Sequence, residues 1–396
     1  MRSRRAPSSA SVSASVSASA SVSASASASV PVSARSSQPS IPSVFPPRPA
    51  RLHGRTRDLA ALTSTILASH PTRIALIGAG GSGKSTLACA LGHRLAKNLP
   101  GGIHWFRVGA WDTPALVGML ALRFRTSHRP SALRRRLASL GQALIVLDNH
   151  ENDAATAALL DALRGAPITW VITARRCLMA GVSIFPVVPP LATQNKDPFP
   201  RVAPLTRLLR WNPVGLEIAS AAVESGAASA EELRRFLLAR GVDRVRVIEH
   251  EDDLPEVGLI VAWAWAKLSP EARRMLAVLA HAGGDHMDER SLIELARAGS
   301  GDRAAEGLAS IRRLKLVQEP LAGRLALHAT VRHALERRTR FPAARLFEHY
   351  VGLLERSPER LDLEQTHLFA AMDYAHDSGD LRSALRVQEL VSKLGV

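Results

Sequence analysis

Apolar residues occur along this chain in runs of two kinds, which predict different secondary structure. Continuous apolar stretches at 74–77 and 143–147, and a third within 168–176, predict buried strands, because strands covered on both faces show no polar alternation. From Lys84 onward, apolar residues recur at the 3.6-residue spacing of a helix. The same spacing fills 362–396, where Ser378 and Gly379 indicate a turn between two helices. Strands separated by helices are typical of a parallel α/β sheet.

The beginning of the chain lacks this patterning. Residues 8–34 are almost wholly Ser, Ala and Val, and 35–50 are rich in Ser and Pro. Small side chains bury too little surface to offset the entropy lost on ordering the backbone. We therefore expect 1–50 to form a disordered basic arm, with the fold beginning near Arg51. No apolar stretch of secretory-signal length is present, whereas an organellar transit segment stays open.

Composition and charge narrow the class of protein. Of 396 residues, 46% are hydrophobic, and no run approaches the roughly 18 apolar residues that a membrane span needs. The two cysteines, Cys89 and Cys177, do not have the spacing of a zinc site or a redox pair. Two unpaired cysteines are consistent with a reducing cytosol. We expect a cytoplasmic protein without a membrane partner. The net charge is +16, but half of it comes from eight arginines in residues 1–57, so we expect nucleic acid to bind only weakly, through the arm.

A glycine-rich loop follows the first predicted strand. Gly78, four residues, then Gly83-Lys84-Ser85 satisfy the P-loop pattern, with a strand before and a helix after. Glycines let backbone N–H groups converge on phosphate oxygens, and the helix N-terminus adds a favourable dipole. Lys84 is predicted to reach the β- and γ-phosphates and Ser85 to ligate Mg²⁺. The predicted phosphate-binding residues are Gly78, Gly80, Gly81, Ser82, Gly83, Lys84, Ser85 and Thr86.

Two further strand ends supply candidate chemistry. Asp148 follows the buried strand 143–147 and is predicted to hold Mg²⁺ together with Ser85. Many P-loop ATPases carry an acid directly after this aspartate, but Asn149 stands here and cannot accept a proton. Glu151 is either the residue that orients the attacking water or a solvated loop carboxylate. Arg175, after the third strand, is either a γ-phosphate contact or a surface charge.

These motifs together resemble the STAND class of signalling NTPases, which includes the NB-ARC proteins and many bacterial regulators. The segment LHGRTRDLAAL (52–62) is similar to the motif that packs on the adenine, which implies roles for Gly54 and Arg55. LIVLDNHE (144–151) is close to the bacterial Walker B form, with His150 in place of a cysteine. ITARR (172–176) matches the sensor strand and implies the γ-phosphate role of Arg175.

The resemblance continues into the second half of the chain. WNPVGLEIASA (211–221) resembles the stretch whose proline touches ADP, which implies that role for Pro213, although Trp211 stands where glycine is usual. Segments 261–295 and 309–335 look like a winged helix that serves as a clamp. His328 falls where the family has a histidine that contacts the β-phosphate of ADP, but the acid that follows it there is Ala329 here. Residues 362–396 resemble the first hairpin of a tetratricopeptide-like array.

The expected fold is therefore an ASCE-type α/β P-loop NTPase followed by an all-α helical subdomain, a winged helix and a helical hairpin. We expect the α/β part at 51–190, the helical subdomain at 191–250, the winged helix at 251–340 and the TPR-like beginning at 341–396. The implied function is an ATP/ADP and Mg²⁺-dependent signalling switch that hydrolyses ATP slowly and self-associates or binds a protein when active. The alternatives are an active remodelling ATPase that uses Glu151, and a nucleotide-stabilised scaffold without switching.

Overall fold

The computed structural model describes residues 45–49, 52, 54–188, 199–241, 255–283, 286–298 and 301–394. Most of the predicted arm at 1–50 lies outside the described residues, as do residues 191–198 and 242–250 of the predicted helical subdomain. Folded structure begins earlier than Arg51, because the ring of Phe45 is 3% exposed. This ring lies against Gly92, where an added Cβ would stand 2.4 Å from it, so Phe45 belongs to the core. Phe45 therefore packs on the fold from within the predicted arm, and the domain bounds themselves stay predictions.

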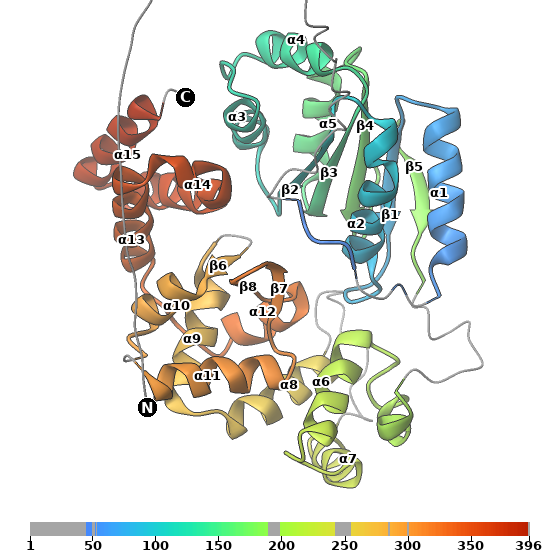
Figure 1. The fold of residues 1–396 in the computed structure, drawn as a ribbon, viewed down its shortest axis with the longest axis vertical. Coiled ribbons are helices and arrows are strands. Elements are labelled where there is room, and N and C mark those ends of the chain that lie inside the picture. The colour runs from blue at the N-terminus through green and yellow to red at the C-terminus, as the bar shows by residue number, and fades with distance from the viewer. Residues whose placement is uncertain are drawn as a thin grey trace, which may run out of the picture. The chain divides into compact units, whose positions relative to one another are not determined.

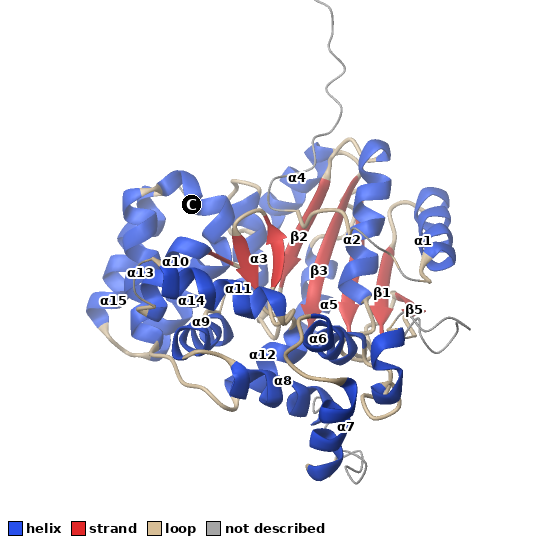
Figure 2. Ribbon diagram, turned by 60° about the horizontal axis from the view of Figure 1, so that its bottom comes forward, coloured by secondary structure: helices blue, strands red, loops and turns tan. Residues whose placement is uncertain are grey.

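The first part of the chain forms a parallel sheet flanked by helices (Figure 1, Figure 2). Its five strands have the order β2-β3-β4-β1-β5, with every pairing parallel. The strands are β1 (Arg73–Ile77), β2 (Ile103–Arg107), β3 (Ala143–His150), β4 (Ile168–Ala174) and β5 (Ser183–Pro186). The helices are α1 (Thr56–Ala68), α2 (Lys84–Leu95), the 3-10 turn η1 (Ala96–Asn98), α3 (Thr113–Arg123), α4 (Pro130–Leu140) and α5 (Asp153–Ala162).

Strand β4 lies between β1, which precedes the glycine-rich loop, and β3, which carries Asp148. Alternate residues of each strand point to opposite faces, so Ile74 and Leu76 pack against α1 and α2 while Ala75 packs towards α3 and α5. Both faces are apolar, which explains the unbroken hydrophobic runs. The arrangement confirms the predicted α/β P-loop NTPase fold.

The remainder of the described chain is mainly helical. A short helical segment and two helices come first: η3 (Pro200–Leu205), α6 (Pro213–Glu224) and α7 (Ala230–Ala239). Five helices then accompany a three-stranded antiparallel sheet of order β6-β8-β7. These elements are α8 (Pro255–Lys267), α9 (Pro270–His281), β6 (Met287–Asp288), α10 (Glu289–Ala296), α11 (Asp302–Arg313), β7 (Gln318–Leu321), β8 (Arg324–Ala326) and α12 (Ala329–Glu336).

Three helices end the described chain: α13 (Ala343–Arg356), the short η4 (Pro358–Arg360) with α14 (Leu361–Asp377), and α15 (Leu381–Lys393). The predicted turn between the last two is confirmed, with Gly379 at φ +63°. Helix α14 packs on α3 of the α/β part, where Gln365 donates to the carbonyl of Met119 at 2.7 Å. The C-terminal helices therefore contact the α/β part directly.

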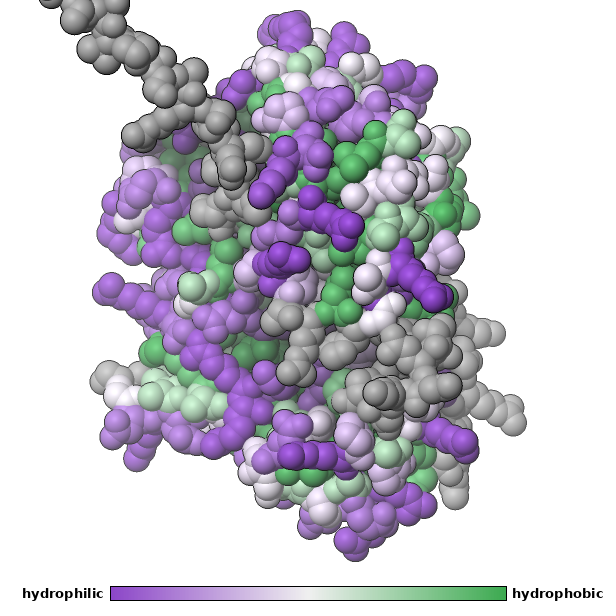
Figure 3. All heavy atoms as spheres, turned by 45° about the vertical axis from the view of Figure 1, so that its right-hand side comes forward, coloured by the Kyte–Doolittle hydropathy of each residue, from purple (hydrophilic) through white to green (hydrophobic). Residues whose placement is uncertain are grey.

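Hydrophobic and hydrophilic residues are interspersed on the face of the molecule shown in Figure 3. Among the described residues, large apolar side chains that remain exposed include Leu178, at 86%, and Leu381, at 71%. Within this same part of the chain, no helix has the length and apolar character needed to cross a membrane.

Candidate functional site

The phosphate loop is shaped by glycines for two different reasons. Gly78 follows β1, and a Cβ there would lie 2.4 Å from the carbonyl oxygen of Val187, so only glycine fits beside the neighbouring strand. Gly81 and Gly83 have φ of +78° and +90°, a left-handed conformation that side chains disfavour. Gly83 immediately precedes α2, so the loop ends at a helix N-terminus, where unpaired N–H groups attract anions.

Lys84, the first residue of α2, lies over this loop. Its Nζ donates to the carbonyls of Gly78 at 2.7 Å and Ala79 at 2.8 Å. Burial, followed by the nearby charge of Arg175, lowers the pKa of Lys84 to about 8, although Asp148 opposes the shift. Two cations held this close favour an anion between them, as in the predicted phosphate role.

Ser85 and Asp148 meet as the sequence predicts for a Mg²⁺ site. The Ser85 hydroxyl donates to Asp148 Oδ1 at 2.6 Å, and the Thr173 hydroxyl donates to the same oxygen at 2.5 Å. A hydroxyl and a carboxylate are hard oxygen ligands of the kind Mg²⁺ prefers. In the described part of the chain, no group of three or more His, Cys, Asp or Glu side chains could hold a metal by itself.

Asp148 does not end its strand as predicted, because β3 continues to His150 through a register shift between Leu147 and His150. Asn149 adopts φ +57° within this irregularity and donates its amide to Glu151 Oε1 at 2.9 Å. His150 is buried, with Nε2 donating to Asp153 and Nδ1 accepting from Thr156. His150 thus orders the start of α5, whereas the exposed Glu151 lines a cleft of about 1400 Å³ that Arg175 also lines.

His328 precedes α12 and caps it, since its Nδ1 accepts from the backbone N–H of Thr330 at 3.2 Å. Burial, then the charges of Arg107 and Lys84, lower the pKa of His328 to about 4. The ring is therefore neutral at pH 7, and because Nδ1 is an acceptor, Nε2 carries the proton and can donate. A neutral donor beside two cations suits a phosphate oxygen.

Arg107, which the sequence reasoning did not single out, belongs to the same site. It ends β2 and pairs in register with Asp148 of β3. Parallel strands present their carboxyl ends at one edge of the sheet. The position of Arg107 at the end of the second strand is therefore the sequence signal that places it with Asp148 and Arg175. Its identity as a cation gave no signal by itself in an arginine-rich chain.

The segment before β1 supports the loop from behind. Arg55 is 6% exposed, and its guanidinium donates to the carbonyl of Ser82 at 2.6 Å and to that of Val188. Gly54 precedes it with φ +63°. The structure thus brings Gly54 and Arg55 to the phosphate loop, while their implied adenine contact stays a prediction.

Residues 210–213 approach the loop from the helical part. Asn212 caps α6, accepting from the N–H of Gly215 at 3.1 Å, and donates to the carbonyl of Gly80 at 3.3 Å. Pro213 is the first residue of α6 and so lies one residue from this contact. Asn212 was missed, although an asparagine before Pro is a helix-start signal. Trp211 has φ +57°, which explains why glycine suits that position.

No family model and no curated protein matches the chain. Several solved structures are similar to it at low identity. A Signal Transduction ATPase with Numerous Domains protein with a tetratricopeptide repeat sensor, from Pyrococcus horikoshii, is 14% identical with a TM-score of 0.49. That match covers 89% of this chain but 49% of the other, so this chain spans about half its length.

The Aeropyrum pernix ORC1 protein in complex with DNA is 16% identical, with a TM-score of 0.29 and coverage of 73% of this chain and 94% of that one. AMPPCP-bound DnaA from Aquifex aeolicus is 15% identical, with a TM-score of 0.26 and coverage of 77% and 94%. These TM-scores lie below 0.5, so the properties of these proteins are not carried over to this chain.

Proposed function

We propose that this chain is a nucleotide-gated molecular switch that binds ADP in its off state and ATP in its on state. The observation that carries the proposal is that Ser85 of α2, Arg107 of β2 and Leu327, which directly precedes His328, line one cavity. Burial, and then the charges of Arg107 and Lys84, lower the pKa of His328 at this place. These residues belong to α2, β2 and the start of α12, so one phosphate group would touch both the α/β part and the helical part. A ligand held from both sides can favour one arrangement of them.

In the proposed off state, the diphosphate of ADP is bound by the loop amides and Lys84 on one side and by His328 Nε2 on the other. Asn212 and Pro213 close the loop from α6, and Arg55 holds its backbone. Exchange for ATP adds a γ-phosphate. The bound nucleotide would then lose its contact with His328 and gain a contact between the γ-phosphate and Arg175. Each nucleotide then stabilises a different arrangement through differential contacts, and a coupling of about 1–3 kcal/mol is typical of such linkage.

Mg²⁺ would be held by Ser85 and Asp148, which already share a hydrogen bond. The ion would neutralise charge on the β- and γ-phosphates when bound. Thr173 fixes the remaining orientation of Asp148 by donating to the same carboxylate oxygen. We propose slow hydrolysis as the step that resets the switch, because the residue directly after Asp148 is Asn149.

The division of the chain follows from the same proposal. The part at 51–190 binds nucleotide, 191–250 is the helical subdomain, and 251–340 is a winged helix that serves as the clamp. Residues 341–396 begin a TPR-like array that meets a protein partner, or a second copy of the chain, on activation. We propose a cytoplasmic protein that needs no membrane partner and binds nucleic acid at most weakly through the arm.

Replacing His328 tests the proposal. Asparagine is a good N-cap, so His328→Asn should keep α12 capped while losing the imidazole, whereas His328→Ala loses both. We expect fluorescent ADP to leave either variant roughly ten-fold faster than wild type, equivalent to about 1.4 kcal/mol. Only His328→Ala should also lose about 0.5–2 kcal/mol of stability.

Other outcomes identify the alternatives. Unchanged ADP release in both variants, with a loss of thermal stability alone, would indicate a nucleotide-stabilised scaffold. A turnover near or above about 1 per second, the low end of usual kcat values, stimulated by DNA or protein, would indicate a working remodelling ATPase.

A further inference from the structure

A second cavity adjoins the proposed Mg²⁺ site, since Ser85 and Asp148 both line it, and it extends along the β2 side of α2. Its volume is about 380 Å³, within the range of small-molecule sites. One wall is α2, through Ser85, Thr86 and Cys89, and the edge strand β2 adds Trp105 and Phe106. Because β2 and β5 are the opposite edges of the sheet, this cavity and the Arg55–Val188 contact beyond β1 lie on different sides of the loop.

The opposite wall comes from distant parts of the chain. Strand β7 contributes Pro320 and Leu321. Leu327, which follows β8 and directly precedes His328, adds to the same wall. Helix α14 contributes Leu363, and the prolines at 46, 47 and 49 complete the apolar lining. Prolines and aromatic rings offer flat, rigid surfaces, so this lining suits a compact ligand with a ring system.

The polar groups at the cavity select for a neutral ligand. Charges of both signs line it, with Arg107 and Arg123 set against the carboxylates of Asp148, Glu319 and Asp362, so neither sign dominates. A ligand without net charge is the one that leaves this balance undisturbed. Gln318 and Asp362 are exposed at the cavity, and their side chains have no hydrogen-bond partner within the described residues, so they can bond to hydroxyl or amide groups of a ligand.

The floor of the cavity is held in place by other contacts. Arg123 donates to Gln365 at 3.1 Å and lies over the ring of Phe106, while Gln365 donates to the carbonyl of Met119. These bonds join α3 to α14, so the cavity has a bonded base rather than a loose gap between helices. A preformed cavity of this kind favours binding, because little ordering is left to the ligand.

We propose that this cavity is a second small-molecule site for a neutral, mostly apolar ligand with a ring and one or two hydroxyl or amide groups. The ligand would touch α2 and the segment before His328 together. It would therefore hold His328 near the phosphate loop and slow ADP release, a coupling that rests on the proposed function. Occupancy of the cavity itself does not depend on it.

The neutral fluorescent dye Nile red serves as the probe, since its emission rises in apolar surroundings. Leu363→Trp fills the cavity from α14, and Met372→Trp on the same helix is the matched control, because Met372 is exposed and does not line the cavity. We expect saturable dye binding to the full chain and to Met372→Trp, and at least roughly ten-fold weaker binding to Leu363→Trp.

A second measurement reads the coupling. Dye at saturation should slow release of fluorescent ADP from wild type by about three-fold or more and leave Leu363→Trp unaffected. Equal dye binding by wild type and Leu363→Trp, or none by wild type, overturns the site. If the dye binds wild type and not Leu363→Trp, but does not slow ADP release from wild type, the coupling is overturned and the site stands. A chain that binds the dye but no nucleotide contradicts the proposed function and leaves the cavity as a site.

Discussion

At the scale of single residues, the proposed site is formed by positively charged or hydrogen-bond-donating side chains that come from separate elements. Lys84 begins α2, Arg107 ends β2, Arg175 follows β4 and His328 precedes α12. Lys84 has its pKa lowered to about 8, by burial and then by Arg175, and His328 to about 4, by burial and then by Arg107 and Lys84. A bound phosphate would neutralise the repulsion between these positive groups. The stability of the fold should therefore depend on pH differently with and without nucleotide.

The first prediction concerns the pH dependence of stability. With its pKa at about 4 in the fold and near 6.5 unfolded, His328 takes up its proton more readily in the unfolded chain. Its contribution is therefore fully present above pH 6.5 and falls as the pH drops towards 4, by up to about 1.4 kcal/mol per pH unit. ADP should flatten this dependence, because phosphate stabilises the protonated ring.

Urea unfolding between pH 6.5 and 4.5, with and without ADP, measures the difference. His328→Asn should reduce the nucleotide-free slope and make it insensitive to ADP. The other histidines whose pKa burial lowers contribute the remaining slope in both proteins, among them His104, His286, His349 and His367. An equal slope in wild type and His328→Asn would contradict the placement of His328.

The second prediction concerns Glu151. Its carboxylate accepts from Asn149 and lies two residues beyond the position directly after Asp148. We expect Glu151→Gln to change ATP turnover by less than about three-fold, and Lys84→Ala to abolish nucleotide binding. General bases contribute roughly 10²–10⁴-fold, so a loss of that size in Glu151→Gln, with nucleotide affinity unchanged, would identify Glu151 as the base of a working ATPase.

Sequence reasoning placed the loop glycines, Lys84 and Ser85 together because local backbone geometry dictates their spacing. It placed Asp148 with Ser85 because an aspartate after a buried strand is typical of a magnesium site in P-loop proteins. It missed Arg107 and Asn212, whose place at the loop depends on tertiary packing. The family resemblance assigned Arg55 to the adenine. The hydrogen bonds of Arg55 in the structure go to Asp58 and to the backbone carbonyls of Ser82 and Val188. Contacts between distant segments leave no periodic signal in the sequence.

At the scale of elements, several helices end in a residue that strains the backbone. Arg125, Arg297 and Lys315 follow α3, α10 and α11 with φ of +49°, +47° and +55°. After α10, the N–H of Ala298 bonds back to Ile293 and that of Arg297 to Glu294, as in a Schellman motif. Glycine is the usual residue at this position because it has no Cβ.

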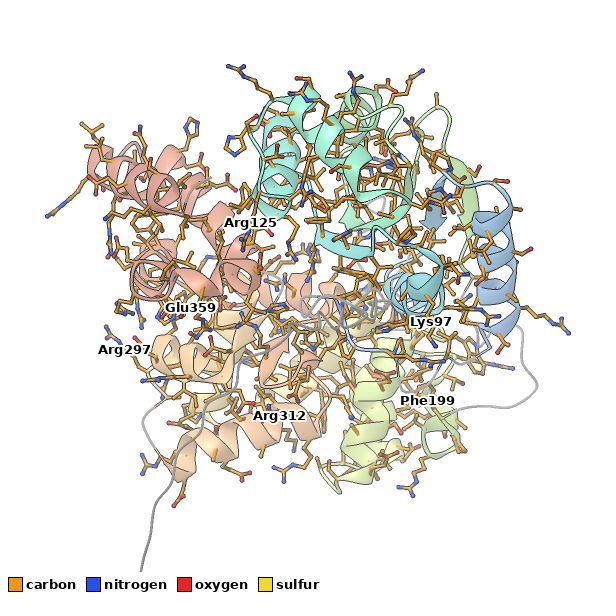
Figure 4. All side chains as sticks on the ribbon, turned by 45° about the horizontal axis from the view of Figure 1, so that its top comes forward. Lys97, Arg125, Phe199, Arg297, Arg312 and Glu359 are labelled. Atoms are coloured by element: carbon orange, nitrogen blue, oxygen red, sulfur yellow. The ribbon has the colours of Figure 1, made fainter. Side chains whose placement is uncertain are left out.

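The third prediction uses α10, whose exposed Arg297 is labelled in Figure 4. Arg297→Gly should raise the free energy of unfolding by about 0.5–1 kcal/mol, because left-handed backbone costs glycine nothing. Arg290→Gly on the same helix should lower it by about the same amount, because glycine inside a helix is unfavourable. Chemical denaturation checks both, and a loss of stability in Arg297→Gly would contradict the assigned helix end.

Element type was predictable from the sequence, and element ends were less so. The buried strands and the C-terminal hairpin followed from periodicity, since both faces of the sheet and one face of each helix are covered. Strand β3 runs to His150 because the register shift at Asn149 lets pairing resume, a feature that hydrophobicity does not encode. The start at Phe45 depends on the missing side chain of Gly92, nearly fifty residues away.

At the scale of the whole molecule, the helical parts are joined by a buried ionic network. Arg324 on β8 is 5% exposed and donates to both carboxylate oxygens of Glu364 on α14, at 2.8 and 2.7 Å. Arg360 bonds the same carboxylate and also Asp288. Removing one member of a buried pair leaves an uncompensated charge, which costs more than the pair contributes.

The fourth prediction is that Glu364→Gln destabilises the fold by about 3–5 kcal/mol. Glu355, which pairs with Arg386 on the surface, provides the control, and Glu355→Gln should cost at most about 1 kcal/mol. Unfolding by urea compares the two. Similar small losses in both variants would mean that β8 and α14 are not held together by this network.

The central claim is that this chain keeps a nucleotide, and the contents of its site after purification test that claim most directly. The protein is denatured, and the supernatant is separated by ion-exchange chromatography. We predict ADP at close to one molecule per chain in wild type, and none in Lys84→Ala. A wild-type site that is empty and turns over added ATP would contradict the switch and favour the remodelling ATPase.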